Sequence, residues 1–353
     1  MLSKVLSCSV IGIHGWLIQV EIEVAFGLPM FSTVGLPDNS VRESKDRVKA
    51  AIKNCGYEFP NKRVTVNLAP ADIKKEGSGF DLPIAVGILA ATEILKKNIQ
   101  GEYCIVGELS LDGTIRRVNG ILPIILAARD HGMQGVIIPE ENIEEARIAP
   151  DGIDVIPVSS LPQVVEFLAG LLQITPTPPS ALDALKRHSR YDIDFSDIKG
   201  QKHVKRALEI AACGGHNVLL KGPPGSGKTM LAKRFPTILP EMTMDEIFET
   251  MKIYSIAGKL SRQNVLFSSR PFRAPHHTIS DAGLIGGGST PQPGEVSLAH
   301  NGVLFLDELP EFKKHVLELL RQPLEEGNVT IVRAKLALTF SSRFMLLAAM
   351  NPC

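Results

Sequence analysis

The chain has 353 residues, enough for two or three domains, and its 38 Lys and Arg residues balance 38 Asp and Glu residues. The chain as a whole is therefore not basic, and any surface for nucleic acid has to be local. Hydrophobic residues make up 44%, enough to bury ordinary cores, and none of the 5 cysteines forms a C-x-x-C pair, which favours reduced thiols. The longest apolar stretch, Leu82–Leu95, is too short to span a bilayer. We expect a cytoplasmic protein with no membrane partner.

Hydrophobic patterns in the first part of the chain predict a mixture of strands and helices. Alternating or continuous apolar residues predict strands at Gln19–Val24, Arg63–Leu68 and Gly135–Pro139. Apolar residues on one face, or a longer apolar run, predict helices at Ser40–Cys55, Pro83–Leu95 and Leu122–His131. Asp112-Gly113 suits a tight turn, which predicts a hairpin between Cys104–Leu109 and Thr114–Val118. This mixture indicates an α+β domain.

A segment rich in proline and polar residues separates this part from the rest. Residues 172–190 contain Pro176, Pro178 and Pro179, which interrupt periodic structure, so we expect a linker between domains at 1–171 and 191–353. The second domain alternates predicted helices with predicted strands. The helices are expected at Val204–Ala212 and Thr229–Arg234, and the strands at Asn217–Leu220, Gly302–Leu306 and Phe344–Met350. The last two strands are apolar enough to lie buried in a parallel sheet, which indicates an α/β core.

Between a predicted strand and a predicted helix lies a glycine-rich loop that fits G-x-x-x-x-G-K-[ST] in full. Its residues are Gly222, Pro223, Pro224, Gly225, Ser226, Gly227, Lys228 and Thr229. Glycine lets backbone N–H groups approach phosphates without a Cβ in the way, and the N-terminus of the following helix favours negative charge. Lys228 is expected to bind the β- and γ-phosphates of ATP, and the Thr229 hydroxyl to bind Mg²⁺. The alternative is a glycine-rich turn with a surface lysine, but the flanking strand and helix favour the phosphate loop.

Polar residues end the other two predicted strands of this core. Asp307 and Glu308 come at the carboxyl end of a buried strand, the edge where ligands bind in open α/β sheets. Asp307 is expected to hold Mg²⁺ through water, and Glu308 to orient and activate the attacking water. Asn351 would bond the γ-phosphate or that water, although a polar residue at such a place is often only a strand cap. The pair His276-His277 is expected to point apart on a strand, which disfavours a shared metal ion.

Together these segments resemble the AAA+ ATPases, with Asn351 in the position of the sensor 1 residue of that family. Three further segments are similar to the magnesium-chelatase-like branch and, within it, to the ComM/YifB family. They are Arg270–Ser280, Gly283–Phe312 and Leu319–Gly327. The resemblance extends over the whole chain. It implies ATP and Mg²⁺ as cofactors and a homo-oligomer, a hexameric ring with ATP bound between neighbouring subunits.

The resemblance also implies two hairpins that face the pore of such a ring. Gly286–Pro293 matches one of them, and its run of glycines is expected to form a mobile tip. Asn328–Leu338 matches the other, where Arg333 and Lys335 would contact the phosphates of DNA. The alternative for both segments is an ordinary solvated loop.

Val106–Asn142 is similar to the proteolytic domain of Lon, which uses a Ser–Lys dyad. The position of the nucleophile falls on Gly79, with Ser78 one step early, and the position of the Lys falls on Leu122. A serine without a base is a weak nucleophile. We therefore expect a Lon-protease-like fold (ribosomal protein S5 domain 2-like) at 1–171 without peptidase chemistry.

The leading hypothesis is an ATP hydrolase that remodels DNA, because the ComM/YifB resemblance implies a branch-migration helicase acting in natural transformation and recombination. A second hypothesis is a magnesium-chelatase-type ATPase that remodels a protein partner. The Lon-like domain argues against it, since the resemblance implies no such domain in chelatase subunits. A third, an ATP-dependent protease, conflicts with the lost dyad. The family also implies a helical lid, a sensor 2 arginine and an arginine finger after residue 353, so we expect the 353-residue chain to bind ATP but hydrolyse it slowly.

Overall fold

The structure is a computed structural model, and it describes residues 1–95, 102–178, 191–260, 269–288, 291–333 and 336–352. The chain divides into two compact units, Met1–Ser180 and Ala181–Cys353. The boundary falls inside the segment predicted as a linker. The start of that segment packs with the first unit, where Thr177 N donates a hydrogen bond to Val155 O.

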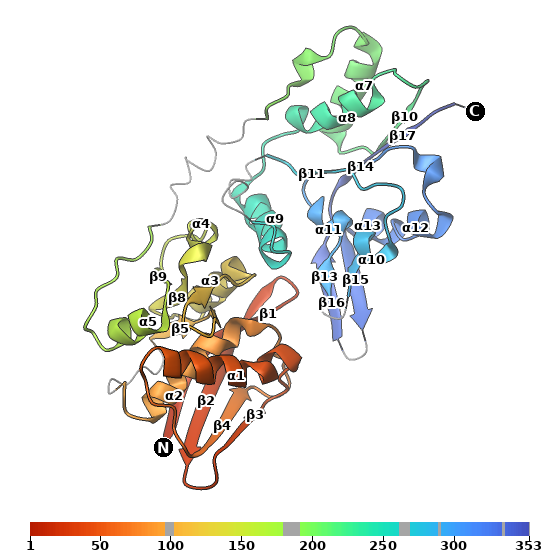
Figure 1. Cartoon of the computed structure of the whole chain (residues 1–353). Helices are drawn as coiled ribbons and strands as arrows, with labels where there is room; N and C mark the ends of the chain where they lie inside the picture. The colour runs from red at the N-terminus through yellow and green to blue at the C-terminus, as the bar shows by residue number, and fades with distance from the viewer. Residues whose placement is uncertain (96–101, 179–190, 261–268, 289–290, 334–335, 353) are drawn as a thin grey trace. The chain divides into compact units, whose positions relative to one another are not determined.

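The first unit is built on a seven-stranded sheet (Figure 1). In spatial order its strands are β3 (Met30–Val34), β4 (Arg63–Ala69), β2 (His14–Ala25), β1 (Leu2–Ile11), β5 (Tyr103–Ile105), β8 (Gly135–Pro139) and β9 (Asp154–Val158). β1 pairs antiparallel with β2, β2 pairs antiparallel with β4, and the other neighbours run parallel. The three strands predicted in this part of the chain are confirmed as parts of β2, β4 and β8.

Helices cover the two faces of this sheet. α1 (Asn39–Asn54) packs with α2 (Asp81–Ala91), and α2 contacts β1 and β2 so closely that a Cβ on Gly87 would lie 2.6 Å from Ile22 Cγ1. α3 (Ile121–Asp130) packs on β2 at Gly15, where a Cβ would lie 2.5 Å from Pro123 O. Residues 15 and 22 of one strand point to opposite faces. The three predicted helices are confirmed, and the described residues of this unit add the shorter α4 (Ile143–Ala146) and α5 (Leu161–Leu168).

The predicted hairpin around Asp112-Gly113 is shorter than expected. Only β6 (Glu108–Leu109) and β7 (Ile115–Arg116) pair antiparallel, whereas β5 ends at Ile105 and runs parallel between β1 and β8. Gly107 separates the two segments, because its N–H donates to Gly79 O and a Cβ there would lie 2.9 Å from Ile115 Cγ2. One apolar run of the sequence therefore contributes strands to two sheets.

The second unit contains a sheet of four parallel strands (Figure 1). In spatial order they are β10 (Val218–Lys221), β17 (Met345–Met350), β14 (Val303–Leu306) and β11 (Phe272–Arg273). α7 (Lys202–Gly214) and α8 (Lys228–Arg234) contribute Leu208 and Leu231 to the core around Phe305 and Leu347. The predicted strands are confirmed, and β14 is buried along its whole length.

Two small hairpins and several short helices complete the described part of this unit. β12 (Gly286–Gly287) pairs with β13 (Gln292–Pro293), and β15 (Asn328–Arg333) pairs with β16 (Leu336–Ser341), so both expected hairpins are present. Gly286 and Gly287 form the paired strand β12, where a Cβ on Gly286 would lie 2.7 Å from Ile331 Cδ1. The mobile tip stays a prediction, since residues 289–290 lie outside the described residues. Lys335 and the side chain of Arg333 lie outside the described residues. The helices are α9 (Met244–Ile256), α10 (Asp281–Leu284), α11 (Glu295–Leu298), α12 (Lys314–Glu318) and α13 (Arg321–Glu326).

Candidate nucleotide-binding site

The glycine-rich loop connects the end of β10 to the start of α8, at the carboxyl edge of the parallel sheet. Gly222 N donates to Met350 O, which holds the start of the loop against β17. Gly225 and Gly227 have φ angles of +75° and +85°, which residues with a Cβ rarely adopt. A Cβ on Gly225 would meet no atom within 4 Å, so this side of the loop is open. The loop is therefore an exposed backbone cradle and not part of the core.

The Lys228 ammonium group is held over this cradle by the loop itself. Its Nζ donates hydrogen bonds to Gly222 O at 2.8 Å, to Pro223 O at 3.0 Å and to Asn351 Oδ1 at 3.0 Å. Phosphate oxygens are better acceptors for an ammonium group, since both partners then carry charge. Ser226 Oγ is buried and has no hydrogen-bond partner among the described residues, and a phosphate would supply one. Pro224 is exposed at the bend of the loop.

Two oxygen donors for a metal ion meet beside the loop. The hydroxyl of Thr229, in the first turn of α8, donates to Asp307 Oδ2 at 2.7 Å. Asp307 follows β14 directly, so the sheet brings together two residues that are 78 positions apart. Hydroxyl and carboxylate oxygens are ligands that Mg²⁺ accepts, with water and phosphate oxygens completing its shell. The residues present therefore fit Mg-ATP, with Thr229 and Asp307 placed to hold the ion.

Glu308 lies next to this pair with an exposed carboxylate and a left-handed backbone, φ +52°. Its N–H donates to Asp307 Oδ1 at 3.0 Å, and its Oε2 lies 3.9 Å from His277 Nδ1. The His277 ring packs against the His276 ring with centroids 4.0 Å apart. The prediction that these two rings point apart is wrong, because the two residues follow β11 in a non-strand segment that enters a turn.

The strand order explains the position of Asn351. β17 lies between β10 and β14, so the residue after β17 lies between the phosphate loop and the acidic pair. Its Oδ1 accepts a hydrogen bond from Lys228, although 123 positions separate the two residues. This contact favours a role toward the nucleotide over a strand cap.

Two residues that the sequence patterns did not single out for this site also contribute to it. Gln201, at the N-terminus of α7, donates from Nε2 to Ser226 O at 3.0 Å and so supports the loop from behind. Its left-handed backbone, φ +48°, directs the chain into the helix after Gly200. His277 is the second, through Glu308. The order of the strands brings His277 to the site, whereas Gln201 reaches it because the start of α7 lies beside the loop; no local pattern encodes either contact.

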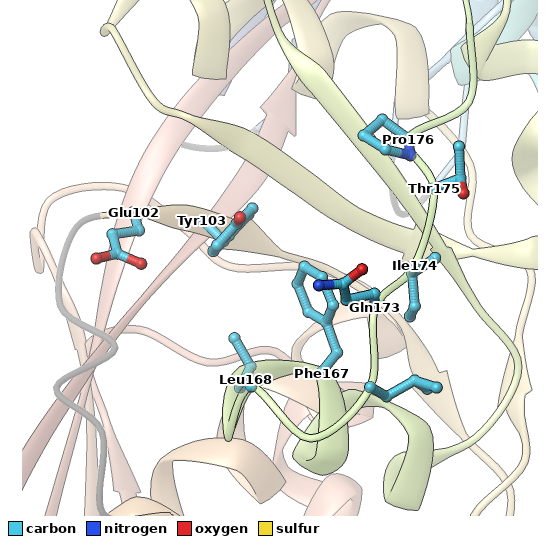
Figure 2. A pocket seen from close by; sticks show the side chains of 10 residues that line it. Glu102, Tyr103, Phe167, Leu168, Gln173, Ile174, Thr175 and Pro176 are labelled. Carbon is cyan, nitrogen blue, oxygen red and sulfur yellow. The ribbon is translucent and has the colours of Figure 1, made fainter.

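Each unit also has an open pocket that does not include the phosphate loop. One of about 500 Å³ in the first unit lies beside Tyr103 and Phe167, whose rings pack edge to face with centroids 5.5 Å apart (Figure 2). Glu102 is the only charged residue among the described residues that line it. Another, of about 650 Å³, lies by Gly302 and Met345, at the amino edge of the second unit's sheet. The candidate site is thus recognised by its donors and acceptors and not by its volume.

In the first unit, the residues at the positions of the Lon dyad make contacts that support the fold. Ser78 Oγ donates to the Glu108 carboxylate. Leu122 is fully buried in α3, and a Cβ on Gly79 would lie 3.7 Å from the Val118 side chain. The absence of peptidase chemistry stays a prediction, which these contacts support.

Comparison with known proteins agrees with this geometry. Competence protein ComM of Haemophilus influenzae is 46% identical to the chain, and the alignment covers 99% of the chain and 69% of ComM. The protein YifB of Escherichia coli is 45% identical, with 99% of the chain and 68% of YifB covered. The chain belongs to the ComM/YifB family. Lon protease 2 of Bacillus subtilis is 27% identical over 43% of the chain and 30% of its own length, in agreement with a Lon-like fold.

Two family models match the chain in addition. The model for magnesium chelatase, subunit ChlI, matches residues 194–353, and the model described as subunit ChlI of Mg-chelatase matches residues 20–142. The chain thus combines a magnesium-chelatase-like AAA+ core with a first unit that a chelatase model also matches. This match weakens the argument from the Lon-like domain against a chelatase-type ATPase. No helix among the described residues is long and apolar enough to cross a membrane.

Proposed function

We propose that the protein is a Mg²⁺-dependent ATP hydrolase that couples ATP turnover to the remodelling of DNA, as a branch-migration motor in natural transformation or recombination. The observation that carries the ATP part is the convergence of Lys228, Thr229, Asp307 and Asn351 at one sheet edge. The DNA part is supported by the 46% identity to a protein named for competence. The ring, a homo-oligomer of hexameric form, belongs to the same proposal.

Each side chain has one task in this scheme. Lys228 exchanges the carbonyls of Gly222 and Pro223 for β- and γ-phosphate oxygens, and the backbone N–H groups of the loop bind the same phosphates. Thr229 and Asp307 would hold Mg²⁺, which would offset the negative charge that the phosphates carry. Asn351 binds the γ-phosphate or the attacking water once Lys228 has turned to the nucleotide.

Glu308 activates the water in this proposal. Its carboxylate accepts a proton from the water as the water oxygen bonds to the γ-phosphorus, and the bond between that phosphorus and the β–γ bridging oxygen breaks. ADP and inorganic phosphate are the products. The left-handed backbone at Glu308 and the nearby His277 ring set the direction of the carboxylate.

The β15–β16 hairpin offers a route from the nucleotide to a substrate. The hairpin precedes β17 directly, and its base is closed by the hydrogen bond from Ser342 N to Gly327 O. Asn351 follows the last residue of β17, so a change at the γ-phosphate reaches the hairpin along one strand. The hairpin would carry Arg333 and Lys335 to the phosphates of DNA in this proposal.

The test is the rate of ATP turnover with no DNA, with single-stranded DNA, with duplex DNA and with a forked duplex. The proposal expects stimulation by DNA, strongest with the forked substrate, and binding that weakens steeply as salt rises. Migration of the branch in the fork should require ATP and Mg²⁺. No stimulation by any of the DNA substrates would contradict the DNA role and leave the nucleotide site unaffected.

A second function, remodelling of a protein partner in the manner of a magnesium chelatase, is supported by the two chelatase models that match both units. It predicts ATP turnover that no DNA stimulates. A third function, that of an ATP-dependent protease, is separated from these two by an assay of casein digestion in the presence of ATP. The proposal expects no digestion.

A further inference from the structure

One edge of α1 in the first unit carries three lysines with no paired acid. Lys45, Lys49 and Lys53 are spaced by four residues, so they follow one another along one side of the helix at about 5.4 Å per turn. All three are exposed, and none forms an ion pair among the described residues. The exposed carboxylates of the same helix, Glu43 and Asp46, do not pair with them either. A row of unpaired ammonium groups of this kind attracts a chain of negative charges.

Aromatic rings continue this row toward the β2–β3 turn. Lys49 Nζ lies 5.8 Å above the centre of the Phe59 ring, which stacks on the Phe31 ring of β3 at 6.5 Å. Lys62 Nζ lies 4.6 Å above the centre of the Phe26 ring. Only two residues separate Phe59 from Lys62 in the chain. Because Phe59 and Lys62 are so close in the chain, we group the two cation–ring pairs with the lysine row of α1 as one surface, the α1–Phe26 surface, which consists of Lys45, Lys49, Lys53, Phe59, Lys62 and Phe26.

The Phe26 ring is 92% exposed, which is unusual for so large an apolar side chain. Its neighbour Leu28 is 88% exposed. An exposed phenylalanine ring does not stabilise the fold through burial. Its open face can stack with a nucleobase, whatever the sequence of the nucleic acid. Ammonium groups beside such rings are the second requirement of a surface for single-stranded nucleic acid, because they contact the phosphates between the bases.

Two other partners fit this surface less well. β3 is the edge strand of the sheet, and pairing with β3 of a second copy would bring two sets of these lysines together, which like charges oppose. An anionic membrane would be contacted at the apolar tip formed by Phe26 and Leu28, but the lysine row extends along α1 from Lys45 to Lys53. A flexible strand of phosphates and bases can follow both parts.

We infer that the α1–Phe26 surface binds single-stranded nucleic acid without sequence preference. The inference rests on the proposed function, since it gives the first unit the task of holding the strand on which the ATPase unit acts. It concerns residues that are distant in the chain from the hairpins expected to contact DNA. It therefore makes the first unit a binding platform in its own right, in place of a peptidase.

The test is binding of a fluorescent oligo-dT by the full chain, followed by fluorescence anisotropy across a series of salt concentrations. In the combined variant Lys45→Gln, Lys49→Gln and Lys53→Gln, the slope of log K against log salt should become shallower by about 2, since each phosphate contact of a single strand contributes about 0.7. Phe26→Ala should weaken binding of the single strand about tenfold and change binding of a duplex of equal length far less, because duplex bases are not free to stack.

A matched control carries the same change of net charge on other parts of the first unit. The combined variant Lys74→Gln, Arg129→Gln and Arg147→Gln removes three other cations of this unit, each within reach of a carboxylate partner. It should bind oligo-dT with the slope of the unsubstituted chain. Thermal melting of all variants shows whether each one is folded, and Phe26→Ala changes an exposed side chain only.

The outcomes separate this surface from the proposed function. Suppose that oligo-dT binds and stimulates ATP turnover, but that the triple lysine variant of α1 has the same salt slope as the control variant. The inference about the surface is then wrong, and the proposed function stands. If the unsubstituted chain binds no oligo-dT, the inference about the α1–Phe26 surface is wrong. If, in addition, no DNA stimulates ATP turnover, the proposed function is wrong as well. Binding of phosphatidylserine vesicles without binding of oligo-dT would identify a membrane as the partner of this surface. A change of oligomeric state in Phe26→Ala would identify a second copy of the chain.

Discussion

Each unit contains a glycine-bearing loop that leads into a helix, and the two loops differ in where their polar groups are directed. In the first unit the loop 75–80 precedes α2, and Asp81 is the first residue of that helix. Lys75 is fully buried and donates to Pro70 O, Ser78 donates to Glu108, and Asp81 forms two hydrogen bonds with Arg47 at 2.7 and 3.0 Å. The polar groups of this loop are thus satisfied by the protein itself.

The loop of the second unit has the opposite character. Among the described residues, Lys228 donates only to carbonyls of its own loop and to the amide oxygen of Asn351, and the Thr229 hydroxyl donates to a carboxylate at an open edge. Ser226 Oγ is buried with no partner among the described residues. The two glycine-bearing loops therefore have different roles: the first supports the fold, and the second is arranged for a ligand. Substitutions should show this as a separation of stability from nucleotide chemistry.

The largest expected effect belongs to the second unit. Glu308→Gln keeps the size of the side chain and removes the base, so ATP turnover should fall by about 10²- to 10⁴-fold. Binding of a fluorescent ATP analogue should stay unchanged, because the loop and Lys228 are intact. Glu311→Gln, an exposed acid three residues away, is the matched control and should leave turnover unaltered. Equal rates in Glu308→Gln and the unsubstituted chain would remove Glu308 from the reaction.

The next effect belongs to the first unit and concerns stability. Arg47→Ala leaves the carboxylate of Asp81, which is 0% exposed, without its charged partner, so the free energy of unfolding should fall by about 3 kcal/mol. Arg42→Ala on the same helix removes an exposed cation and should cost less than about 0.5 kcal/mol. Hydrogen exchange of α1 and α2 measures both. If Arg47→Ala lost affinity for ATP while the hydrogen exchange of α1 and α2 stayed unchanged, the loop of the first unit would not be purely structural, and the contrast between the two loops would fail.

Lys228→Ala sharpens the contrast from the other side. Charge-assisted hydrogen bonds contribute about 1.5–3 kcal/mol, so affinity for the ATP analogue should fall about 10- to 100-fold. The melting temperature should change little, since Lys228 donates only to groups at the open edge. Lys233→Ala, an exposed lysine of the same helix, should change neither quantity. Full affinity in Lys228→Ala would show that the cradle holds no phosphate.

Local patterns predicted most of what lies within one element, and little of what joins elements. The strands 63–69 and 135–139 and the helix 39–54 follow from alternation and from apolar residues on one face. The hairpin at Asp112 was predicted too long because a close backbone approach at Gly107, which ends the strand, depends on Ile115 and Gly79. Contacts across the fold determine where such a run ends.

The candidate site divides in the same way. A motif fixes its residue types by spacing, so Lys228, Thr229 and Asp307 could be named from the sequence alone. Gln201 and His277 could not, because Gln201 reaches the site through the position of α7 beside the loop, and His277 through the order β10, β17, β14, β11. The ion pair between Arg47 and Asp81 spans 34 positions and left no periodic signal in either segment.

The smallest expected effect is a difference in acid sensitivity between the units. Burial lowers the pKa of His300 in the second unit, where Nδ1 accepts a hydrogen bond from Arg343 N and Nε2 donates to Glu249. Protonation would put a second N–H opposite the Arg343 N–H. Burial raises the pKa of Asp81 in the first unit, and the hydrogen bonds from Arg47 oppose that rise only in part.

The two shifts have opposite consequences below neutral pH. The unfolded second unit binds a proton at His300 more readily than the folded one, so stability from this group is present above about pH 6.5 and is lost as the pH falls through that value, by at most about 1.4 kcal/mol per pH unit. The folded first unit accepts a proton at Asp81 more readily than the unfolded one, so acid costs it nothing at this group. Hydrogen exchange from pH 7 to pH 5, corrected for intrinsic rates, should therefore show opening of β14 and β17 before β1 and β2. His300→Gln should flatten the slope of the second unit, while His216→Gln, at an exposed histidine, should not; equal slopes in both variants would mean that His300 is not the group that titrates.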